Sequence, residues 1–209
     1  MNAISRTLGR LVLLSASVGC VTDAVVPLAY APVGDSPIAT AVGDATIVVD
    51  VRDARRLAPT WVIGTMRDGM GRESAHVLAS GAPAAAVREA FTAELTRVGY
   101  RVVGPDDGAA EPGARTVVIT LRDLWTDHGQ ASTGALVAVV DTEVRLRQAT
   151  GDEVHIDVVG RAAIGTPGWD PIGDVSNAAI ADWSRTVVRV PELRAFLAAS
   201  ARSAALDAR

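Results

Sequence analysis

The chain contains little of the residue types on which catalytic and metal sites are usually built. One cysteine, Cys20, and three histidines occur among its 209 residues, and aromatic residues make up 4% of them. A single cysteine excludes an internal disulfide, which requires two thiols. The histidines, His76, His128 and His155, are 52 and 27 residues apart, so no two have the spacing of a zinc motif. The sequence therefore predicts neither a metal site nor a cofactor.

Two further absences exclude whole classes of function. Lys and Arg number 20 against 24 Asp and Glu, a formal net charge of −4, so bulk electrostatics give no basis for binding nucleic acid. The apolar run that starts at Leu11 has about ten residues, whereas a membrane-spanning helix needs about 20. Apolar residues still make up 49% of the chain, which is enough for a hydrophobic core and argues against disorder.

The first 19 residues have the three-part form of an export signal. Arg6 and Arg10 make the start basic, no acidic residue precedes Asp23, and an apolar run leads into small residues. Because this run is too short to span a bilayer, we interpret residues 1–19 as a signal peptide that is removed. The mature chain would then carry a formal charge of −6, since both leader arginines are lost.

Cys20 stands at the end of this leader, directly after Ser17-Val18-Gly19. The segment resembles a lipobox, the site at which bacteria attach diacylglycerol to a cysteine and cleave the chain immediately before it. Gly19 fits that pattern, whereas Ser17 occupies a position where leucine is usual. The resemblance implies that Cys20 is a lipid-attachment site. The absence of other thiols also suits an oxidising compartment outside the cytoplasm.

Two alternatives for Cys20 compete with lipidation. A free cysteine behaves as a small hydrophobic residue and can be buried in a core, although a core position directly after so apolar a leader is unexpected. Ordinary signal cleavage after Ala29-Tyr30-Ala31 also matches the small-x-small pattern. That cut would leave Pro32 as the first mature residue, which disfavours it. Lipidation is therefore the favoured prediction.

Residues 20–44 form the next segment, and its prolines exclude a continuous helix. It is predicted to be either a lipidated tether or, around residues 24–32, an edge strand that tolerates proline. We expect partial docking on the domain, because a free tether would leave several apolar side chains poorly hydrated. These are Val25, Val26, Leu28 and Tyr30. Residues 45–205 are predicted to form a single α+β domain.

Hydrophobic periodicity gives the secondary structure of that domain. Apolar alternation and short apolar runs predict strands at residues 45–53, 60–68, 100–104, 116–125, 134–148 and 153–165. Helical spacing predicts helices at residues 82–100, 174–190 and 191–206, with Asp174 or Ser176 capping the second. The predicted fold class is α+β: a mostly antiparallel sheet with a long hairpin in the C-terminal half and helices packed on one face.

The long hairpin has one apolar and one charged face, as expected for an antiparallel pair with one wet side. A three-residue loop at Thr150-Gly151-Asp152 puts both apolar sets on the same side. It also sets Arg145 opposite Asp157 and Asp141 opposite Arg161. A docking surface is one interpretation of this charged face, and a plain solvated face is the favoured one.

Several weak motifs together resemble one family, the YajG-like bacterial envelope lipoproteins. They are Asp53 and Arg55 after the first strand, Ile63-Gly64, the helix that ends in Gly99-Tyr100, and the closing helix "NAAIADWSRTVV". The likeness covers about residues 20–200, with the lipobox at the same place in the layout. It implies a lipid-anchored periplasmic protein with this kind of fold. The biochemical role of that family is poorly defined, so the resemblance implies location rather than activity.

Three tryptophans, Trp61, Trp125 and Trp169, are the candidate partner-contact residues, with packing in or near the core as the alternative for each. No pattern indicates catalysis. Adjacent Asp127 and His128 would point to opposite faces of a strand. The sequence "GQASTG" has one residue too many for a serine-nucleophile elbow and leads into a strand instead of a helix. We therefore predict that the protein is not an enzyme.

These observations predict a lipid-anchored periplasmic envelope protein that binds or scaffolds an envelope protein partner. The alternative is an accessory lipoprotein of an envelope or lipid transport system, in which the sheet and helices would enclose an apolar groove. Its membrane contact is expected through the N-terminal lipid, which holds a multiply acylated cysteine in the bilayer. Val21 after Cys20, in place of aspartate, favours the inner leaflet of the outer membrane, facing the periplasm.

Overall fold

The computed structural model describes residues 22–32, 38, 40, 46–56, 60–68, 70–108, 115–128, 135–148, 151–165 and 171–207. Its elements are, in order, β1 (Ala24–Val26), β2 (Thr46–Asp53), β3 (Val62–Arg67), β4 (Glu73–Ala79), α1 (Pro83–Arg97), β5 (Arg101–Val103), α2 (Pro105–Gly108), β6 (Arg115–His128), β7 (Ala135–Arg147), β8 (Glu153–Gly165), α3 (Ile172–Val187) and α4 (Pro191–Asp207). Among these described helices, none combines the length and the hydropathy that crossing a membrane requires.

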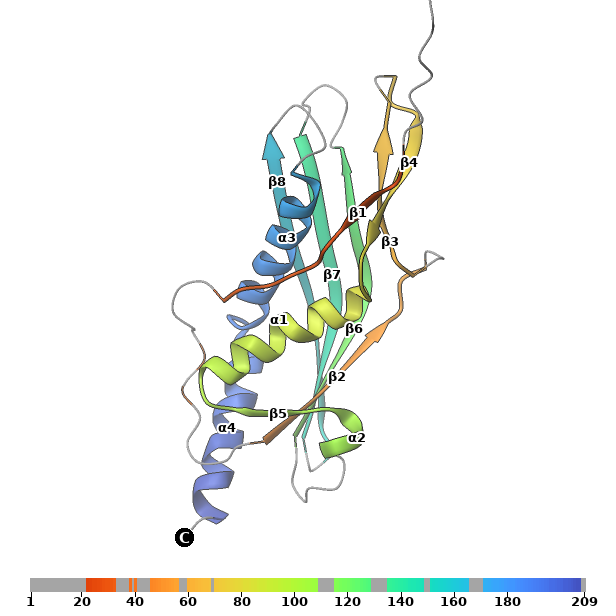
Figure 1. Cartoon of the computed structure of the whole chain (residues 1–209). Coiled ribbons are helices and arrows are strands. Elements are labelled where there is room, and N and C mark those ends of the chain that lie inside the picture. The colour runs from red at the N-terminus through yellow and green to blue at the C-terminus, as the bar shows by residue number, and fades with distance from the viewer. Residues whose placement is uncertain are drawn as a thin grey trace, which may run out of the picture.

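Strand β6 connects the two parts of the sheet. One of its edges pairs with β7 in antiparallel register along nearly its whole length. The other edge is divided: β2 pairs with it in parallel as far as Leu121, and β3 meets it at the pair Gly64–Thr126. The strand order is β1-β4-β3-β6-β2-β5, with β7 and β8 on the far side of β6. The sheet therefore branches where β2 leaves β6 and β3 joins it (Figure 1).

The predicted α+β class is confirmed. The longest pairings are antiparallel, because β6, β7 and β8 form a meander and β3 pairs with β4. Helices α1 and α3 pack against one face of the sheet (Figure 1). Parallel pairings of β1 with β4, and of β2 with β5 and β6, make the sheet mixed. The sequence patterns did not predict those parallel pairs.

The core lies between the sheet and these two helices. The apolar stripe that helical spacing predicts comprises Val87, Ala90, Phe91, Leu95 and Val98. The first four are fully buried in α1, and Val98, 9% exposed, is the residue that caps its C-terminus. From α3, Trp183 enters the same core, with its ring centroid 6.4 Å from that of Phe91. Trp183 Nε1 donates a hydrogen bond to Thr142 Oγ1 on β7 at 2.8 Å, so its buried polar atom has a partner.

The predicted cap of α3 is wrong. The helix begins at Ile172, two residues before Asp174, with Pro171 at the N-cap position and no side-chain cap. Asp174 lies in the first turn, where its charge is favourable beside the positive end of the helix dipole. Ser176 is buried inside the helix: its Oγ donates to the carbonyl of Ile172 and is 2.9 Å from Thr126 Oγ1 on β6.

The predicted register of the β7–β8 hairpin is wrong by two residues. Asp157 pairs with Glu143, and Arg145 pairs with His155. The backbone N–H of Gln148 donates to the carbonyl of Asp152, so the three-residue connection is 149–151 instead of 150–152. Both loops have odd length, and the predicted faces are therefore retained: β7 alternates strictly between buried and partly exposed side chains.

The chain reaches the sheet through a segment that we call the strap, residues 24–30. Its first part is β1, and the hydroxyl of Tyr30 then donates a hydrogen bond to the buried carboxylate of Glu94 on α1. Three of the four apolar side chains expected to dock do pack against the core; they are Val26, Leu28 and Tyr30. Val25 is 64% exposed instead, because successive residues of a strand point to opposite faces.

Helix α3 approaches the sheet most closely at Gly160 of β8. A Cβ atom added to Gly160 would lie 2.4 Å from the backbone N and the Cβ of Trp183. The backbone N–H of the next residue, Arg161, donates to the Asp182 carboxylate at 3.0 Å. Glycine is therefore needed at this position because it lets the helix and the strand touch directly.

We predict that Gly160→Ala destabilises the fold by about 1–3 kcal/mol, because the added methyl group overpacks the contact with Trp183. Urea unfolding followed by circular dichroism measures the change. Gly165→Ala, at the end of the same strand, is the matched control, since an added Cβ there meets nothing within 4 Å. The control should stay within about 0.5 kcal/mol of the wild type. Equal stability of the two variants would contradict the prediction.

Candidate functional site

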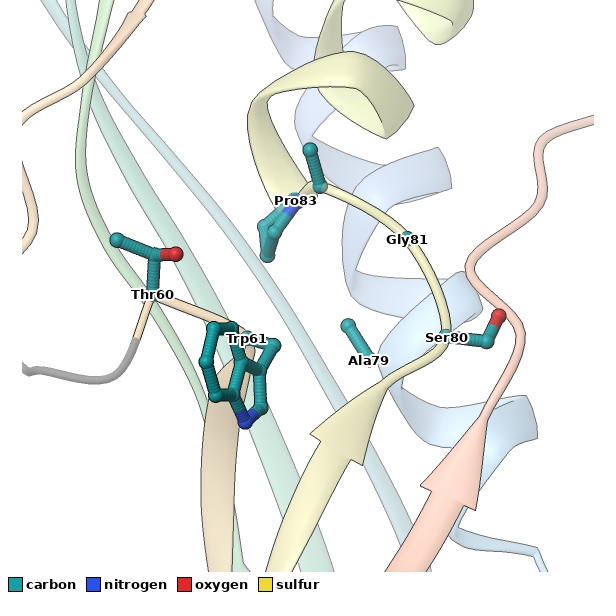
Figure 2. A pocket seen from close by; sticks show the side chains of 7 residues that line it. Thr60, Trp61, Ala79, Ser80, Gly81 and Pro83 are labelled. Carbon is teal, nitrogen blue, oxygen red and sulfur yellow. The ribbon is translucent and has the colours of Figure 1, made fainter.

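A pocket of about 350 Å³ opens where β3 begins and β4 passes into α1. We call it the Trp61 pocket. Its lining residues are Thr60, Trp61, Ala79, Ser80, Gly81, Ala82 and Pro83. Figure 2 shows the 60–61 segment on one side of the space and the arc of residues 79–83 on the other. The indole of Trp61, 53% exposed, is its largest side chain.

The frame of the Trp61 pocket is held by backbone contacts from three elements. The N–H of Ala79 donates to the carbonyl of Trp61 at 2.8 Å, and the N–H of Ser80 donates to that of Val26 in β1 at 2.9 Å. Pro83 starts α1, where its missing N–H costs nothing. The pocket is therefore built on the ends of regular elements and presents a preformed aromatic surface.

The side chains that line the Trp61 pocket are all uncharged. None of its lining side chains is titratable, and its polar side-chain atoms are the hydroxyls of Thr60 and Ser80 and the indole N–H of Trp61. A large exposed indole in such a place contributes contact area at little entropic cost, and tryptophan is the residue most enriched at the energetic centres of interfaces. The arrangement suits an apolar or aromatic group of a ligand or partner.

Of the four predicted site residues, two lie within the described part of the chain. Trp61 is exposed and lines the pocket, and its contact with a partner stays a prediction. Trp125 is partly buried in β6 beside Val139 of β7 and does not line the pocket. Cys20 and Trp169 lie outside the described residues. The lining stretch from Ala79 to Pro83 carried no motif, and only the tertiary structure brings it to Trp61.

A second cavity of about 470 Å³ lies at the branch of the sheet, lined by Ala54, Arg56, Arg122 and Asp123. Beside it, Arg55 is buried, with 1% of its side chain exposed. Its guanidinium makes two hydrogen bonds to the Asp53 carboxylate and donates to the carbonyls of Thr60 and Val62. Arg55 thus joins the end of β2 to the start of β3 and fills the space between them.

The carboxylates at the branch have shifted pKa values with structural causes. Burial opposes ionisation of Asp53, but the hydrogen bonds and charge of Arg55 outweigh it and lower the pKa of Asp53. Burial raises the pKa of Asp123, and the nearby charge of Asp141 raises it further. A carboxylate with a raised pKa that lies beside a cavity is a candidate general acid or base. The other side chains that line this cavity are two arginines and an alanine, which supply no nucleophile.

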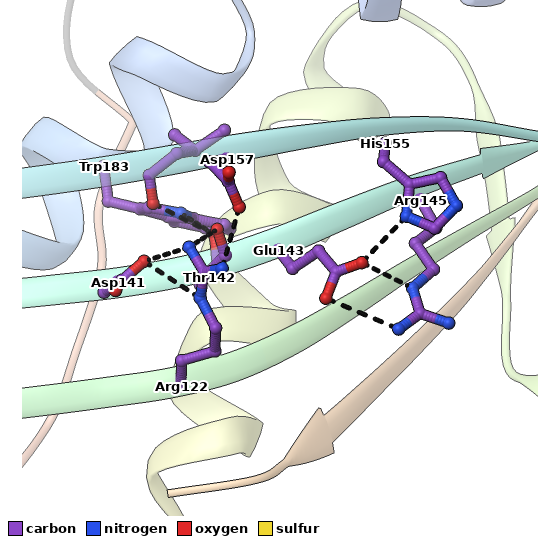
Figure 3. A network of polar contacts seen from close by, with 9 residues as sticks. Arg122, Asp141, Thr142, Glu143, Arg145, His155, Asp157 and Trp183 are labelled. Carbon is purple, nitrogen blue, oxygen red and sulfur yellow. Dashed lines mark hydrogen bonds and ion pairs between the residues drawn. The ribbon is translucent and has the colours of Figure 1, made fainter.

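The open face of the meander carries a network of ion pairs (Figure 3). Arg122 of β6 bridges Asp141 of β7 and Asp157 of β8, at 2.7 and 2.8 Å. Farther along, Glu143 accepts hydrogen bonds from Arg145 Nε at 2.8 Å and from the His155 ring at 2.9 Å. Those bonds lower the pKa of Glu143 to about 2. The face is thus a set of mutually paired charges.

Comparison with known proteins gives fold relatives only. No protein-family model matches the chain, and no curated protein does. The crystal structure of protein XCC0632 from Xanthomonas campestris, of family model DUF330, is similar over 87% of this chain and 99% of its own, with a TM-score of 0.58 at 12% identity. Another crystal structure, of an uncharacterized protein, covers 78% of this chain and 97% of its own, with a TM-score of 0.50 at 16% identity.

Bacterial lipoproteins are also among the structural neighbours. Lipoprotein GNA1162 from Neisseria meningitidis is similar over 65% of this chain and 95% of its own, at 14% identity. Its TM-score of 0.35 is too low to support an inference. The shared fold with the DUF330 protein is therefore the finding, and membership of the YajG-like family stays a prediction.

The lowered pKa of Glu143 predicts a pH dependence of stability. A carboxylate whose pKa is lower in the folded state than in the unfolded state stabilises the fold at pH values above its unfolded-state pKa. This contribution is lost as the pH falls toward its folded-state pKa. Glu143→Gln should therefore cost about 0.2–1 kcal/mol at neutral pH, and the cost should vanish between pH 4.5 and about 2. Thermal unfolding across that range measures it. Glu73→Gln, at a 61% exposed carboxylate 3.7 Å from Arg67, is the control. A constant difference for Glu143→Gln would overturn this assignment.

Proposed function

We propose that the chain is a lipid-anchored, non-catalytic binding protein of the bacterial envelope, attached through Cys20 and engaging an envelope protein partner at the Trp61 pocket. The observation that carries the binding role is the exposed indole of Trp61 in a preformed pocket. Exposed aromatic residues at the rim of a rigid concave surface favour recognition of a partner.

The anchor rests on the leader sequence and is supported by the course of the strap. Four residues after Cys20, Ala24 already pairs with Val77 of β4, so the domain begins close behind the proposed lipid. The residue after the cysteine, Val21, favours the outer membrane, with the domain in the periplasm. This placement also agrees with a chain that would have no free thiol once Cys20 is acylated.

Binding is favoured over the two other roles by what fills the domain. The space between the sheet and the helices is occupied by buried side chains such as Phe91 and Trp183, which favours a packed core over the apolar groove of a transport accessory protein. Arginines lower the pKa values of Asp53 and Glu143, which suits structure better than proton transfer. Asp123, whose pKa is raised, lines its cavity with two arginines and an alanine, which supply no nucleophile. Both points support a non-catalytic module.

The anchor predicts the fractionation of a Cys20→Ala variant. The wild type should sediment with membranes and release an N-terminal peptide carrying acylated Cys20 by mass spectrometry. The variant should keep its leader or appear in the soluble fraction, because the thiol that accepts the diacylglycerol is absent. A wild type that is fully soluble, or whose mature terminus is Pro32, would contradict the anchor.

The Trp61 pocket predicts loss of a specific contact. A photocrosslinking residue at Ser80 should give discrete higher-mass products in cells, and Trp61→Ala should remove them, since truncating an interface tryptophan often costs about 2 kcal/mol or more. Val154→Ala, at an exposed apolar residue of β8, is the matched control and should leave the products unchanged. An unchanged pattern in Trp61→Ala would refute this binding role.

A further inference from the structure

The N-terminal strand fixes the direction from which the chain arrives. β1 runs parallel to β4, with Ala24 beside Val77 and Val26 beside Ala79. One residue earlier, the carboxylate of Asp23 accepts a hydrogen bond from the backbone N–H of His76 at 2.8 Å. Moving toward the N-terminus along β1 therefore means moving along β4 toward the turn that joins it to β3.

Chain length then limits how far Cys20 can lie from that turn. Cys20 precedes Ala24 by four residues, and Glu73, the first residue of β4, precedes Val77 by the same number. In extended backbone either stretch covers about 13 Å. From Thr22, the first described residue, Cys20 can be at most about 7 Å away. A lipid on Cys20 is thus tied close to the turn.

The strap prevents this end of the chain from pulling away. After β1, the backbone N–H of Ala29 donates to the Asn177 side chain at 2.9 Å, and the amide of Asn177 donates back to the carbonyl of Pro27 at 3.3 Å. Tyr30 is bonded to the buried carboxylate of Glu94. The strap is therefore hydrogen-bonded to both α3 and α1. Only the short stretch of chain before Thr22 lies outside these contacts and those of β1.

The turn itself is described at residues 67–68 and 70–73, which we call the β3–β4 tip. Asp68 holds it together: one carboxylate oxygen accepts the N–H groups of Met70 and Arg72 at 2.9 Å each, and the other accepts Arg72 Nε at 2.9 Å. Gly71, at φ 78°, has a conformation that other residues rarely adopt. This organised turn presents Met70, 73% exposed, as the most exposed large apolar side chain of the described residues.

Charge balance at the β3–β4 tip also suits a lipid surface. The mature chain would carry a formal charge of −6, which an anionic lipid surface repels. The charged residues of the tip are two arginines, one aspartate and one glutamate, so its own charge is zero. Arg67 lies 3.0 Å from Asp127, and Arg72 lies 2.9 Å from Asp68. With Asp127 counted beside Arg67, the local formal charge is −1, so the tip contributes little of the repulsion between the mature chain and an anionic surface.

We infer that the β3–β4 tip rests on the phospholipid leaflet that holds the Cys20 lipid, with Met70 inserted among the head groups. The inference builds on the proposed function, because it requires the anchor. In this orientation β3 extends from the tip away from the membrane. The Trp61 pocket lies at the other end of β3, about 20 Å from the tip at the rise per residue of a strand. Figure 1 shows β1 beside the half of β4 that is farther from this tip, and it shows β7 ending and β8 beginning at the opposite end of the sheet.

Depth-sensitive labelling of the full lipidated chain tests this orientation. Met70→Cys, or Arg72→Cys as a second tip position, is labelled with a nitrobenzoxadiazole thiol reagent and reconstituted in vesicles of phosphatidylethanolamine and phosphatidylglycerol. The acylated sulfur of Cys20 cannot react, so the new thiol is labelled alone. Val154→Cys, at an exposed apolar position beside the β7–β8 turn, is the matched control. Circular dichroism confirms that each variant is folded.

At the tip we expect the label's emission to shift to the blue and to be lost when lipids carrying a doxyl quencher are included, and at residue 154 we expect neither change. Equal signals at the two ends, with Cys20 shown by mass spectrometry to be acylated, overturn the membrane-facing tip and leave the anchor intact. A Cys20 that carries no lipid overturns the proposed function itself. The same samples therefore distinguish failure of the membrane-facing tip from failure of the proposed function.

Discussion

The fold depends on how one edge of β6 is shared between two partners. β2 pairs with this edge as far as Leu121, and β3 pairs with it at Thr126. In the gap between these two pairings, β2 and β3 form no ladder with each other. Arg55 closes the gap by donating to the carbonyls of Thr60 and Val62 while its charge is met by Asp53. Val62 is buried, and a buried carbonyl without a partner would be costly. Because this guanidinium supplies the donors, one sheet can carry two branches: β2–β5 on one side of the gap, and β3–β4–β1, with the Trp61 pocket, on the other.

The sequence predicted the β7–β8 hairpin of the meander because its two faces differ in polarity, and the predicted alternation along β7 is confirmed. It missed the register because loops at 149–151 and 150–152 have the same parity, which leaves the apolar faces unchanged. A local signal was present: a three-residue hairpin loop places its left-handed residue last, and Gly151, at φ 93°, is that residue. The prediction of the α3 cap was wrong because Ile172 is buried against the core, so the helix begins before both polar candidates, Asp174 and Ser176.

The candidate site was predictable only in part. Trp61 could be named from the sequence, but whether it is exposed depends on where the β4–α1 connection passes, and no pattern in residues 79–83 reports that. The role of Arg55 could not be predicted from the sequence either, because it arises from parallel pairings between strands that are distant in the chain. Its place in the YajG-like motif marked the residue without giving a reason. The structure supplies one: Arg55 joins the two branches of the sheet.

The parallel pairing of β1 with β4 also has a mechanical consequence. A force applied at the N-terminal end of β1 acts along the strand, so the hydrogen bonds between the two strands are loaded together in shear instead of being peeled apart one after another. Beyond β1, the same load passes to the contacts of the strap with Asn177 and Glu94. Tension on the N-terminus is thereby distributed over a strand and two helices, so the attachment resists tearing at the end where any tether would pull.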